Sequence, residues 1–153
     1  GEVVWKRRFW ATGRTMTHPK TSVAASTPAS DGERIVALFS CNDLICLDLN
    51  GDVQWIRGLT QDYPNASNSL GMSSSPIFVD GVVIIQIEND SQSLALGVDP
   101  KTGKNLWILD RPKAANWTSP IRVPKPDGSG HWVALQSNKG LDLVEPATGS
   151  LRW

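Results

Sequence analysis

The sequence is poor in the features that define several protein classes. It has two cysteines in 153 residues, too few for a disulfide-stapled scaffold. Fifteen Lys and Arg residues balance fifteen Asp and Glu residues, and this net charge of zero argues against a basic surface for nucleic acid or anionic membrane. The longest apolar run, residues 82–85, has the length of a strand and not of a membrane span. The first residues do not form a signal peptide, so an exported protein would carry that signal outside this chain.

Tryptophan, in contrast, is abundant and regularly spaced. Seven tryptophans accompany a single tyrosine. Four of them close the same Gly-x-x-x-Trp pattern, at Trp5, Trp55, Trp107 and Trp153, with separations of 50, 52 and 46 residues. A self-similar period of about 40–50 residues is typical of propeller blades.

A second landmark recurs in phase with the tryptophans. Two Ser or Thr residues precede each of Pro28, Pro76 and Pro120, which lie 27–33 residues before a repeat tryptophan. Proline suits the first residue of a strand, where no backbone N–H is needed for the sheet. Turn signals such as Asp80-Gly81 then divide each unit into four short segments. In the second unit, strands are expected at residues 75–79, 82–88, 93–99 and 105–109.

These patterns predict an all-β fold with no long helix, because no segment has a sustained 3.6-residue apolar period. A four-stranded antiparallel meander repeated radially makes a β-propeller. About three blades are expected here, and three blades cannot close a ring, so we expect a piece of a ring of six to eight blades. The expected divisions are an outer strand of a preceding blade plus a loop (1–23), blades at 24–57, 74–109 and 119–153, and inter-blade loops at 58–73 and 110–118.

Residues 98–107, VDPKTGKNLW, resemble the repeat of pyrroloquinoline-quinone (PQQ)-type propellers, roughly Ala-x-Asp-x-x-Thr-Gly-x-x-x-Trp. Residues 144–153 match with Glu in place of Asp, and residues 46–55 match less well, lacking the Thr and one residue. The resemblance implies that the repeat tryptophans dock between blades as a structural lock. It also implies that the acids of the motif, Asp48, Asp99 and Glu145, stabilise turns.

The same resemblance leaves several functions open, because a fold does not determine an activity. The family includes PQQ- and calcium-dependent alcohol and sugar dehydrogenases, and also propellers that bind no quinone, such as the outer-membrane protein assembly lipoprotein of bacteria. We expect a non-catalytic binding or assembly scaffold of an exported bacterial protein, periplasmic or extracellular and without a cofactor. Its partners would be the remaining blades and a protein, peptide or glycan. The alternatives are a fragment of a quinoprotein dehydrogenase and a propeller attached to a separate catalytic domain.

Cysteine and metal-ligand patterns give the dehydrogenase alternative little support. That branch typically carries two adjacent cysteines, whereas Cys41 and Cys46 are separated here. Around a turn at Asn42-Asp43, we expect Cys41 opposite Leu44 and Cys46 opposite Phe39, as two buried thiols in a poor geometry for a disulfide. Oxygen ligands for calcium are available at Asp62, Asn65, Asn68, Asp90 and Asn116, but without calcium-loop spacing. His18 and His131 are far apart in the sequence, so no metal site is expected.

Two long connections, residues 6–22 and 58–72, are the segments most suited to carry a binding site. In a propeller, such loops lie on one face around the central channel. Aromatic and polar residues in the inter-blade loops form the expected ligand face: Trp10, Tyr63, Asn65, Asn68 and Trp117. The alternative is that these are long surface loops, with Trp117 packed at the top of its blade.

Overall fold

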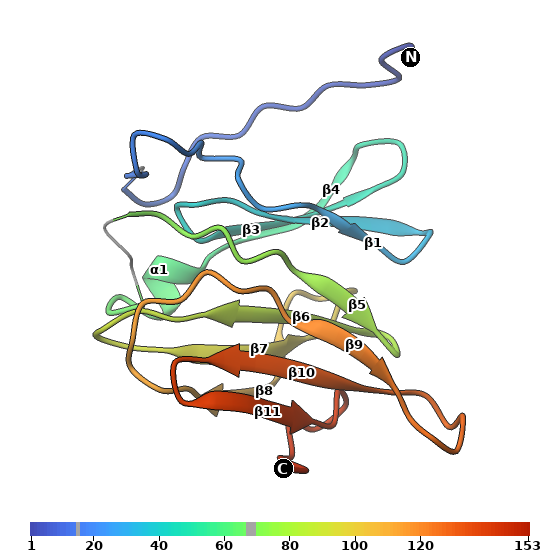
Figure 1. Ribbon diagram of the computed structural model, residues 1–153. Helices are drawn as coiled ribbons and strands as arrows, with labels where there is room; N and C mark the ends of the chain where they lie inside the picture. The colour runs from blue at the N-terminus through green and yellow to red at the C-terminus, as the bar shows by residue number, and fades with distance from the viewer. Residues whose placement is uncertain (15, 67–69) are drawn as a thin grey trace.

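The computed structural model describes residues 1–14, 16–66 and 70–153, and it is built almost entirely of antiparallel strands. Its three sheets stack one against the next along the molecule (Figure 1). The first sheet contains β1 (Ala29–Ser30), β2 (Arg34–Leu38), β3 (Asp43–Asp48) and β4 (Val53–Gly58). The second contains β5 (Ile77–Val79), β6 (Val82–Ile87), β7 (Leu94–Val98) and β8 (Asn105–Asp110). The third contains β9 (Ile121–Pro124), β10 (His131–Ser137) and β11 (Gly140–Val144).

The predicted all-β architecture is confirmed. The strands of the second sheet begin and end within two residues of the expected bounds. Asp80 and Gly81 both have positive φ, 47° and 81°, as a tight two-residue hairpin turn requires. The one helix among the described residues, α1 (Leu59–Asp62), has a single turn. No described helix has the length and apolar character needed to cross a bilayer.

Strand β6 of the middle sheet is buried on both faces, which explains the apolar run at residues 82–85. Val83 and Ile85 of β6 face the first sheet and pack with Val36 and Leu44. Ile84, between them, points to the other side, into a second cluster with Val133 and Leu135 of the third sheet. Because successive side chains of a strand point to opposite faces, a strand with two buried faces loses its polar alternation.

Two expected strands differ from the structure. Residues 149–153 do not form a fourth strand of the third sheet and are joined to it by a single bridge, Val144 to Leu151. Within the described residues no strand precedes β1, so the outer strand expected to end at Trp5 does not form either. A strand is held by backbone hydrogen bonds to a neighbour, whereas in the described part of the chain the segment around Trp5 is held by its side chains, with Trp5 and Arg7 donating to the carbonyls of Leu49 and Gly51.

The hairpin between β2 and β3 has a different register from the one expected. Leu38 pairs with Leu44 and Val36 pairs with Cys46, so the predicted partners of both cysteines were wrong. The turn begins earlier than expected: the Phe39 N–H donates to the carbonyl of Asp43, and Asn42 takes a left-handed conformation with φ of 63°. Cys41 therefore lies in the turn and Cys46 in the strand, and both thiols are buried and free.

Candidate functional site

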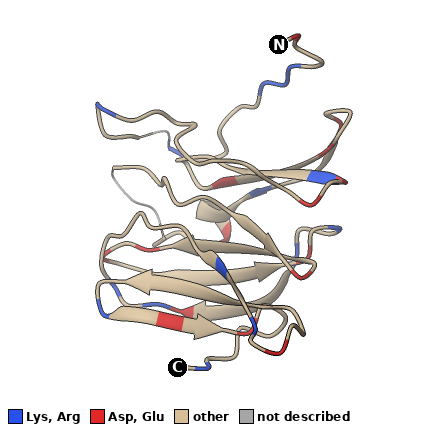
Figure 2. Ribbon diagram, turned by 45° about the vertical axis from the view of Figure 1, so that its right-hand side comes forward, with Lys and Arg blue, Asp and Glu red and all other residues tan. Residues whose placement is uncertain are grey.

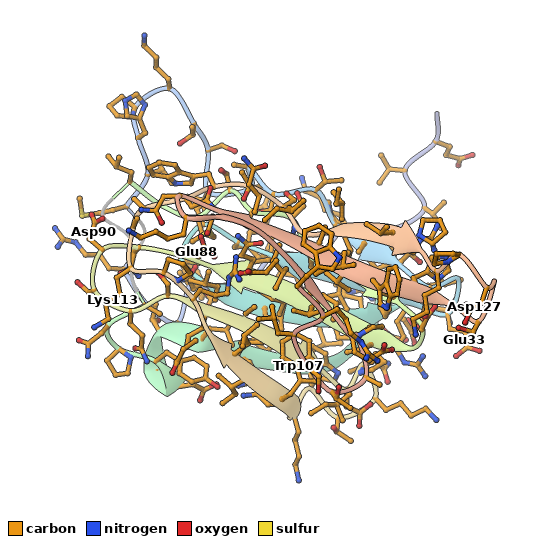
Figure 3. All side chains as sticks on the ribbon, turned by 60° about the horizontal axis from the view of Figure 1, so that its bottom comes forward. Glu33, Glu88, Asp90, Trp107, Lys113 and Asp127 are labelled. Carbon is orange, nitrogen blue, oxygen red and sulfur yellow. The ribbon has the colours of Figure 1, made fainter. Side chains whose placement is uncertain are left out.

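The two ends of the sheets carry different kinds of connection. At one end, which we call the turn end, lie the short turns β1–β2, β3–β4, β5–β6, β7–β8 and β9–β10 (Figure 1). The β2–β3, β6–β7 and β10–β11 turns and the two connections between sheets lie at the other, the loop end. Glu33 and Asp127 mark the turn end in Figure 3, whereas Glu88, Asp90 and Lys113 mark the loop end. Positive and negative residues are interspersed along turns and loops (Figure 2).

At the turn end, three repeat tryptophans make the same contact with the following sheet. The indole N–H of Trp55 donates to the carbonyl of Pro100 at 2.9 Å, and that of Trp107 to the carbonyl of Pro146 at 2.7 Å. Trp5 does the same with Leu49 at 2.9 Å. Each ring lies on a glycine of positive φ, where an added Cβ would come within 2.6–2.7 Å of a ring carbon: Gly51 under Trp5, Gly103 under Trp55, Gly149 under Trp107. The glycine of the repeat is therefore needed for its turn and for the close approach of the preceding tryptophan.

The fourth repeat tryptophan differs from the other three. Trp153 is 62% exposed and its indole N–H has no acceptor among the described residues, whereas Trp107 is 8% exposed. Backbone bonds hold the segment instead, because the Leu143 N–H donates to the carbonyl of Trp153. The role of the four tryptophans as an inter-blade lock stays a prediction.

The three repeat acids lie in corresponding turns but bind different groups. Asp48 accepts the backbone N–H groups of Asn50 and Asp52, both at 2.9 Å. Asp99 accepts the Lys101 N–H at 2.9 Å and the Thr102 hydroxyl at 2.8 Å, and these bonds hold the pKa of Asp99 below its usual value.

Glu145, one methylene longer, binds cations in place of turn amides. It accepts from Lys125 Nζ at 2.9 Å and from Arg152 at 3.2 Å. The bond from Lys125 is the main cause that lowers the pKa of Glu145, and the bond from Arg152 adds to it.

An arginine contact accompanies the tryptophans and was missed in the sequence. Arg7 and Arg57, each two residues after a repeat tryptophan, donate to the carbonyls of Gly51 and Gly103 at 2.6 and 2.7 Å. The signal was available as Trp-x-Arg in the first two units, whereas Leu109 takes the third position.

At the loop end, a hollow of about 230 Å³ opens where the chain enters the innermost strands of the three sheets; we call it the mouth pocket. Its lining comes from segments before β1, β5 and β9 and from the β2–β3 turn: His18, Thr21, Ala25, Ser40, Leu70, Gly71, Met72, Ser73 and Trp117. Hydrogen bonds join these segments. The Trp117 indole donates to the carbonyl of Gly71 at 2.9 Å, and the Ser40 hydroxyl to the carbonyl of Met72 at 2.7 Å.

A polar hollow of about 410 Å³ lies next to a buried ionic network at the same end of the sheets. Its lining is Asn65, Ser91, Gln92, Ser93, Asp110, Arg111 and Lys113. The guanidinium of Arg111 donates to Glu88 at 2.8 Å and also binds Asp142, so it ties the second sheet to the third. Sequence reasoning missed this network because its members come from separate elements without a fixed spacing.

A third hollow, of about 850 Å³, lies on the outer face of the first sheet. Residues of the N-terminal segment line it, including Arg7, Phe9 and Trp10, opposite Ile45 of β3. Trp10 is 97% exposed there, whereas Ile45 beneath the segment is 1% exposed.

The structure does not bring the expected ligand-face residues into one site. Trp10 lines the outer-face hollow, Trp117 the mouth pocket and Asn65 the polar hollow. Tyr63 packs against the core between the first two sheets, and its hydroxyl accepts from Asn105 at 2.5 Å. Asn68 lies outside the described residues.

Among the described residues, the oxygen donors expected from the sequence do not gather around the mouth pocket. The mouth pocket is lined by no carboxylate, whereas calcium takes six to eight oxygen ligands. Among the expected oxygen donors, Asp62 pairs with Arg57 at 2.6 Å and Asn116 donates to Glu88 at 2.8 Å. In the described part of the chain no three His, Cys, Asp or Glu residues are grouped as metal ligands. Of the two histidines, His131 is at the turn end, 2.8 Å from Asp80.

Comparison with known proteins identifies the family. The family model described as outer membrane protein assembly factor BamB matches residues 1–153. The chain belongs to this family. A comparison with curated protein sequences gave no match.

Solved structures resemble this BamB-family chain in fold. BamB from Moraxella catarrhalis gives a TM-score of 0.61 at 15% identity, over 88% of this chain and 38% of that one. Quinohemoprotein alcohol dehydrogenase from Comamonas testosteroni gives 0.61 at 15% identity, over 90% of this chain and 29% of the other. A europium-containing methanol dehydrogenase gives 0.58 at 13% identity, over 92% and 34%. The chain thus spans between 29% and 38% of the length of these proteins, and the likeness shows the fold.

Proposed function

We propose that this chain is part of a non-catalytic propeller of an exported protein, and that it binds a protein partner through the loop end of its sheets. The proposal rests on one difference between the two ends: contacts between sheets occupy the turn end, whereas open hollows lie at the loop end. At the turn end, tryptophan and arginine side chains donate to carbonyls of the repeat, and the indoles cover its glycines. At the loop end, the mouth pocket and the polar hollow are two separate open hollows.

The loop end has the composition of a protein-binding surface. Trp117 is 40% exposed at the mouth pocket, and Lys113 is exposed at the polar hollow. Exposed aromatic residues surrounded by a polar rim are typical of the centre of protein interfaces. The family description, an assembly factor for outer membrane proteins, supports a protein as the partner and export as the location.

The dehydrogenase alternative is disfavoured by the donor groups at the loop end. The two cysteines are not adjacent: Cys41 lies in a turn and Cys46 lies in β3. The mouth pocket is lined by no carboxylate that could bind calcium. We therefore derive no redox step. The outer face of the first sheet, with its hollow of about 850 Å³, is the place where a preceding blade of a six- to eight-bladed ring would pack.

Site-specific photo-crosslinking in the full-length protein tests the proposal. A benzophenone amino acid replaces Lys113 at the loop end in one variant and Asp127 at the turn end in the other; both positions are exposed and labelled in Figure 3. In intact cells we expect a discrete protein adduct at position 113 and none at 127. Adducts at 127 alone, or at neither position, would contradict a loop-end binding face.

A further inference from the structure

The interface between the first and second sheets can be compared, position by position, with the one between the second and third. The residue after each repeat proline pairs with one residue of the second strand of its sheet: Val36, Ile84 or Ala134. These three residues therefore occupy the same position. Two residues further along the second strand, the first sheet has Leu38, whereas the second sheet has Gln86. At this position the face that meets the following sheet is thus apolar in the first sheet and polar in the second.

Leucines of the first interface correspond to charged residues at the second. Leu59 follows β4 directly and Arg111 follows β8 directly, and the N–H of each donates to the carbonyl of the residue just before the third strand of its sheet. Leu96 of β7 and Asp142 of β11 each pair with the residue that follows the shared position in the second strand. Leu38, Leu59 and Leu96 lie in one cluster between the first two sheets and are at most 2% exposed. Where the first interface has two leucines, the second therefore has an arginine and an aspartate.

The guanidinium of Arg111 uses all three of its nitrogens at the second interface. Its Nε donates to Glu88 at 2.8 Å, its Nη2 donates to the carbonyl of Leu135 at 3.1 Å, and its Nη1 binds Asp142. The side chains of Arg111 and Glu88 are 2% and 1% exposed, and the second oxygen of Glu88 accepts from Asn116. Leu135 and Asp142 belong to the third sheet, so the network is complete only when the second and third sheets are packed together.

Stability alone does not require such a network. Taking an arginine and a carboxylate out of water costs free energy that their attraction only partly offsets, so apolar residues of similar volume at the same place are often as stabilising or more so. The first interface shows that this architecture accepts leucines at two of the corresponding positions, Leu59 and Leu96. A different advantage must therefore accompany the charged residues.

That advantage is discrimination between sheets. Blades of similar sequence can misassemble or exchange between copies of a repeat protein. If the third sheet packed against the first, Asp142 would face Leu59 and find no cation there; if the second sheet packed against another copy of itself, Arg111 would face Leu96. Both arrangements leave a buried charge without its partner, which is strongly destabilising. Two leucine surfaces, in contrast, accept one another without such a penalty.

We infer that the Glu88–Arg111–Asp142 network determines which sheet packs against the second one, at a cost in stability. The second sheet accepts the third, which supplies a carboxylate and a backbone carbonyl to Arg111, and rejects a sheet with leucine at the position of Asp142. The inference concerns the pairing of blades and is independent of the partner proposed for the loop end.

An apolar replacement in the full-length protein tests the inference. Arg111→Leu, Asp142→Leu and Glu88→Ser together give the second interface the residues that the first has at these positions, since Ser40 occupies the place of Glu88 in the first sheet. The urea concentration at half-unfolding measures stability. Pairing is measured by fluorine NMR of protein labelled with 5-fluorotryptophan.

Two tryptophans report on the two interfaces. Trp107 packs with residues of the third sheet and lies apart from Glu88 in Figure 3, so the substitutions do not touch it. Trp55 packs against the cluster between the first two sheets and serves as the internal control. Each signal is assigned as the one that is lost when that tryptophan is replaced by Phe.

We expect the triple variant to unfold at the same urea concentration as the parent or a higher one. Its Trp107 should nevertheless give more than one signal, with proportions that change with protein concentration as copies exchange blades, while Trp55 keeps a single signal. The parent should give one signal for each. Arg111→Leu alone should lower the urea midpoint, because Glu88 then stays buried without a cation, and the other two substitutions should restore it.

Arg34→Leu is the matched control. It removes an arginine that pairs with two carboxylates, Asp31 and Glu33, within the first sheet, and should leave Trp107 with one signal. A triple variant that is less stable than the parent, or that does not fold, would show that the network is needed for stability. An equally stable triple variant with one Trp107 signal at every concentration would show that leucines pair these sheets just as uniquely. Either result overturns the inference.

Discussion

Neighbouring sheets are joined by different contacts at the turn end and at the loop end. At the turn end, Trp5, Trp55 and Trp107 each place an indole on a glycine and donate to a carbonyl of the following sheet. At the loop end, the connections at residues 59–76 and 111–120 differ in length, and one ionic network centred on Arg111 joins the second sheet to the third. The contact at the turn end recurs from sheet to sheet, whereas the contacts at the loop end do not.

The tryptophans of the turn end also differ in exposure from those that the sequence places on a ligand face. Among the tryptophans that make the recurring contact, Trp107 is buried at 8% exposure, whereas Trp5 and Trp55 are partly buried. The two tryptophans that the sequence places on a ligand face are more accessible: Trp117 is 40% exposed and Trp10 is 97% exposed. Substitutions at the two ends should therefore divide into those that unfold the protein and those that change its binding.

The largest effect should come from removing a turn-end indole. Trp107→Ala deletes a ring that packs between the second and third sheets and donates to the carbonyl of Pro146. We expect a loss of about 3–5 kcal/mol in the free energy of unfolding, measured by urea denaturation. The matched change Trp10→Ala, at an exposed tryptophan, should cost less than about 1 kcal/mol. Equal losses in the two variants would refute the division between the ends.

A smaller effect is expected at a glycine beneath an indole. Gly103 has φ of 70°, and an added Cβ would lie 2.7 Å from a ring carbon of Trp55. Gly128 has nearly the same φ, 72°, with no atom near the added Cβ. Gly128→Ala measures the backbone strain alone, about 1–2 kcal/mol. Gly103→Ala should cost a further 1–3 kcal/mol or so, because the ring must move.

Gly128→Ala is thus the matched control for Gly103→Ala. Both changes are measured by the same thermal and urea unfolding experiments. If Gly103→Ala is no more destabilising than Gly128→Ala, the close approach of Trp55 contributes nothing to stability.

The turn end could be predicted from the sequence because its signals are local. Asp80-Gly81 specifies its own hairpin, and glycines at Gly103 and Gly149 adopt the positive φ that their turns need. The Trp-x-Arg contact was equally local and could have been found by aligning the units. The register of the β2–β3 hairpin was predicted wrongly, because Asn42, a non-glycine residue, takes the left-handed conformation and moves the turn.

The candidate site could not be predicted in the same way. Three lining residues of the mouth pocket, Ala25, Ser73 and Trp117, each lie three residues before a repeat proline, whereas His18 and Ser40 have no such spacing. Trp117 was expected on a ligand face, but its neighbours from outside the repeat were not, because no local signal in the sequence marks them. Asn65 and Tyr63 were grouped with it by sequence, and they lie in other surroundings.

The smallest expected effect on stability concerns Glu145. It tests whether the charge of this residue stabilises its turn, as distinct from the turns of Asp48 and Asp99. Lys125 and Arg152 hold the pKa of Glu145 below its ordinary value of 4.5, so the carboxylate stabilises the folded state above that pH and loses this effect as the pH falls through the lowered pKa. Glu145→Gln should therefore reduce the melting temperature at pH 6–7, by an amount equivalent to about 1 kcal/mol or less. The difference from the parent should shrink as the pH falls below 4.5 and through the lowered pKa of Glu145, because the parent then becomes protonated as well. Glu2→Gln, at an exposed position, is the control and should leave the melting temperature unchanged. A difference between parent and Glu145→Gln that stays constant from pH 3 to pH 7 would mean that Glu145 stabilises its turn by shape and not by charge, unlike Asp99, whose carboxylate accepts from its own turn.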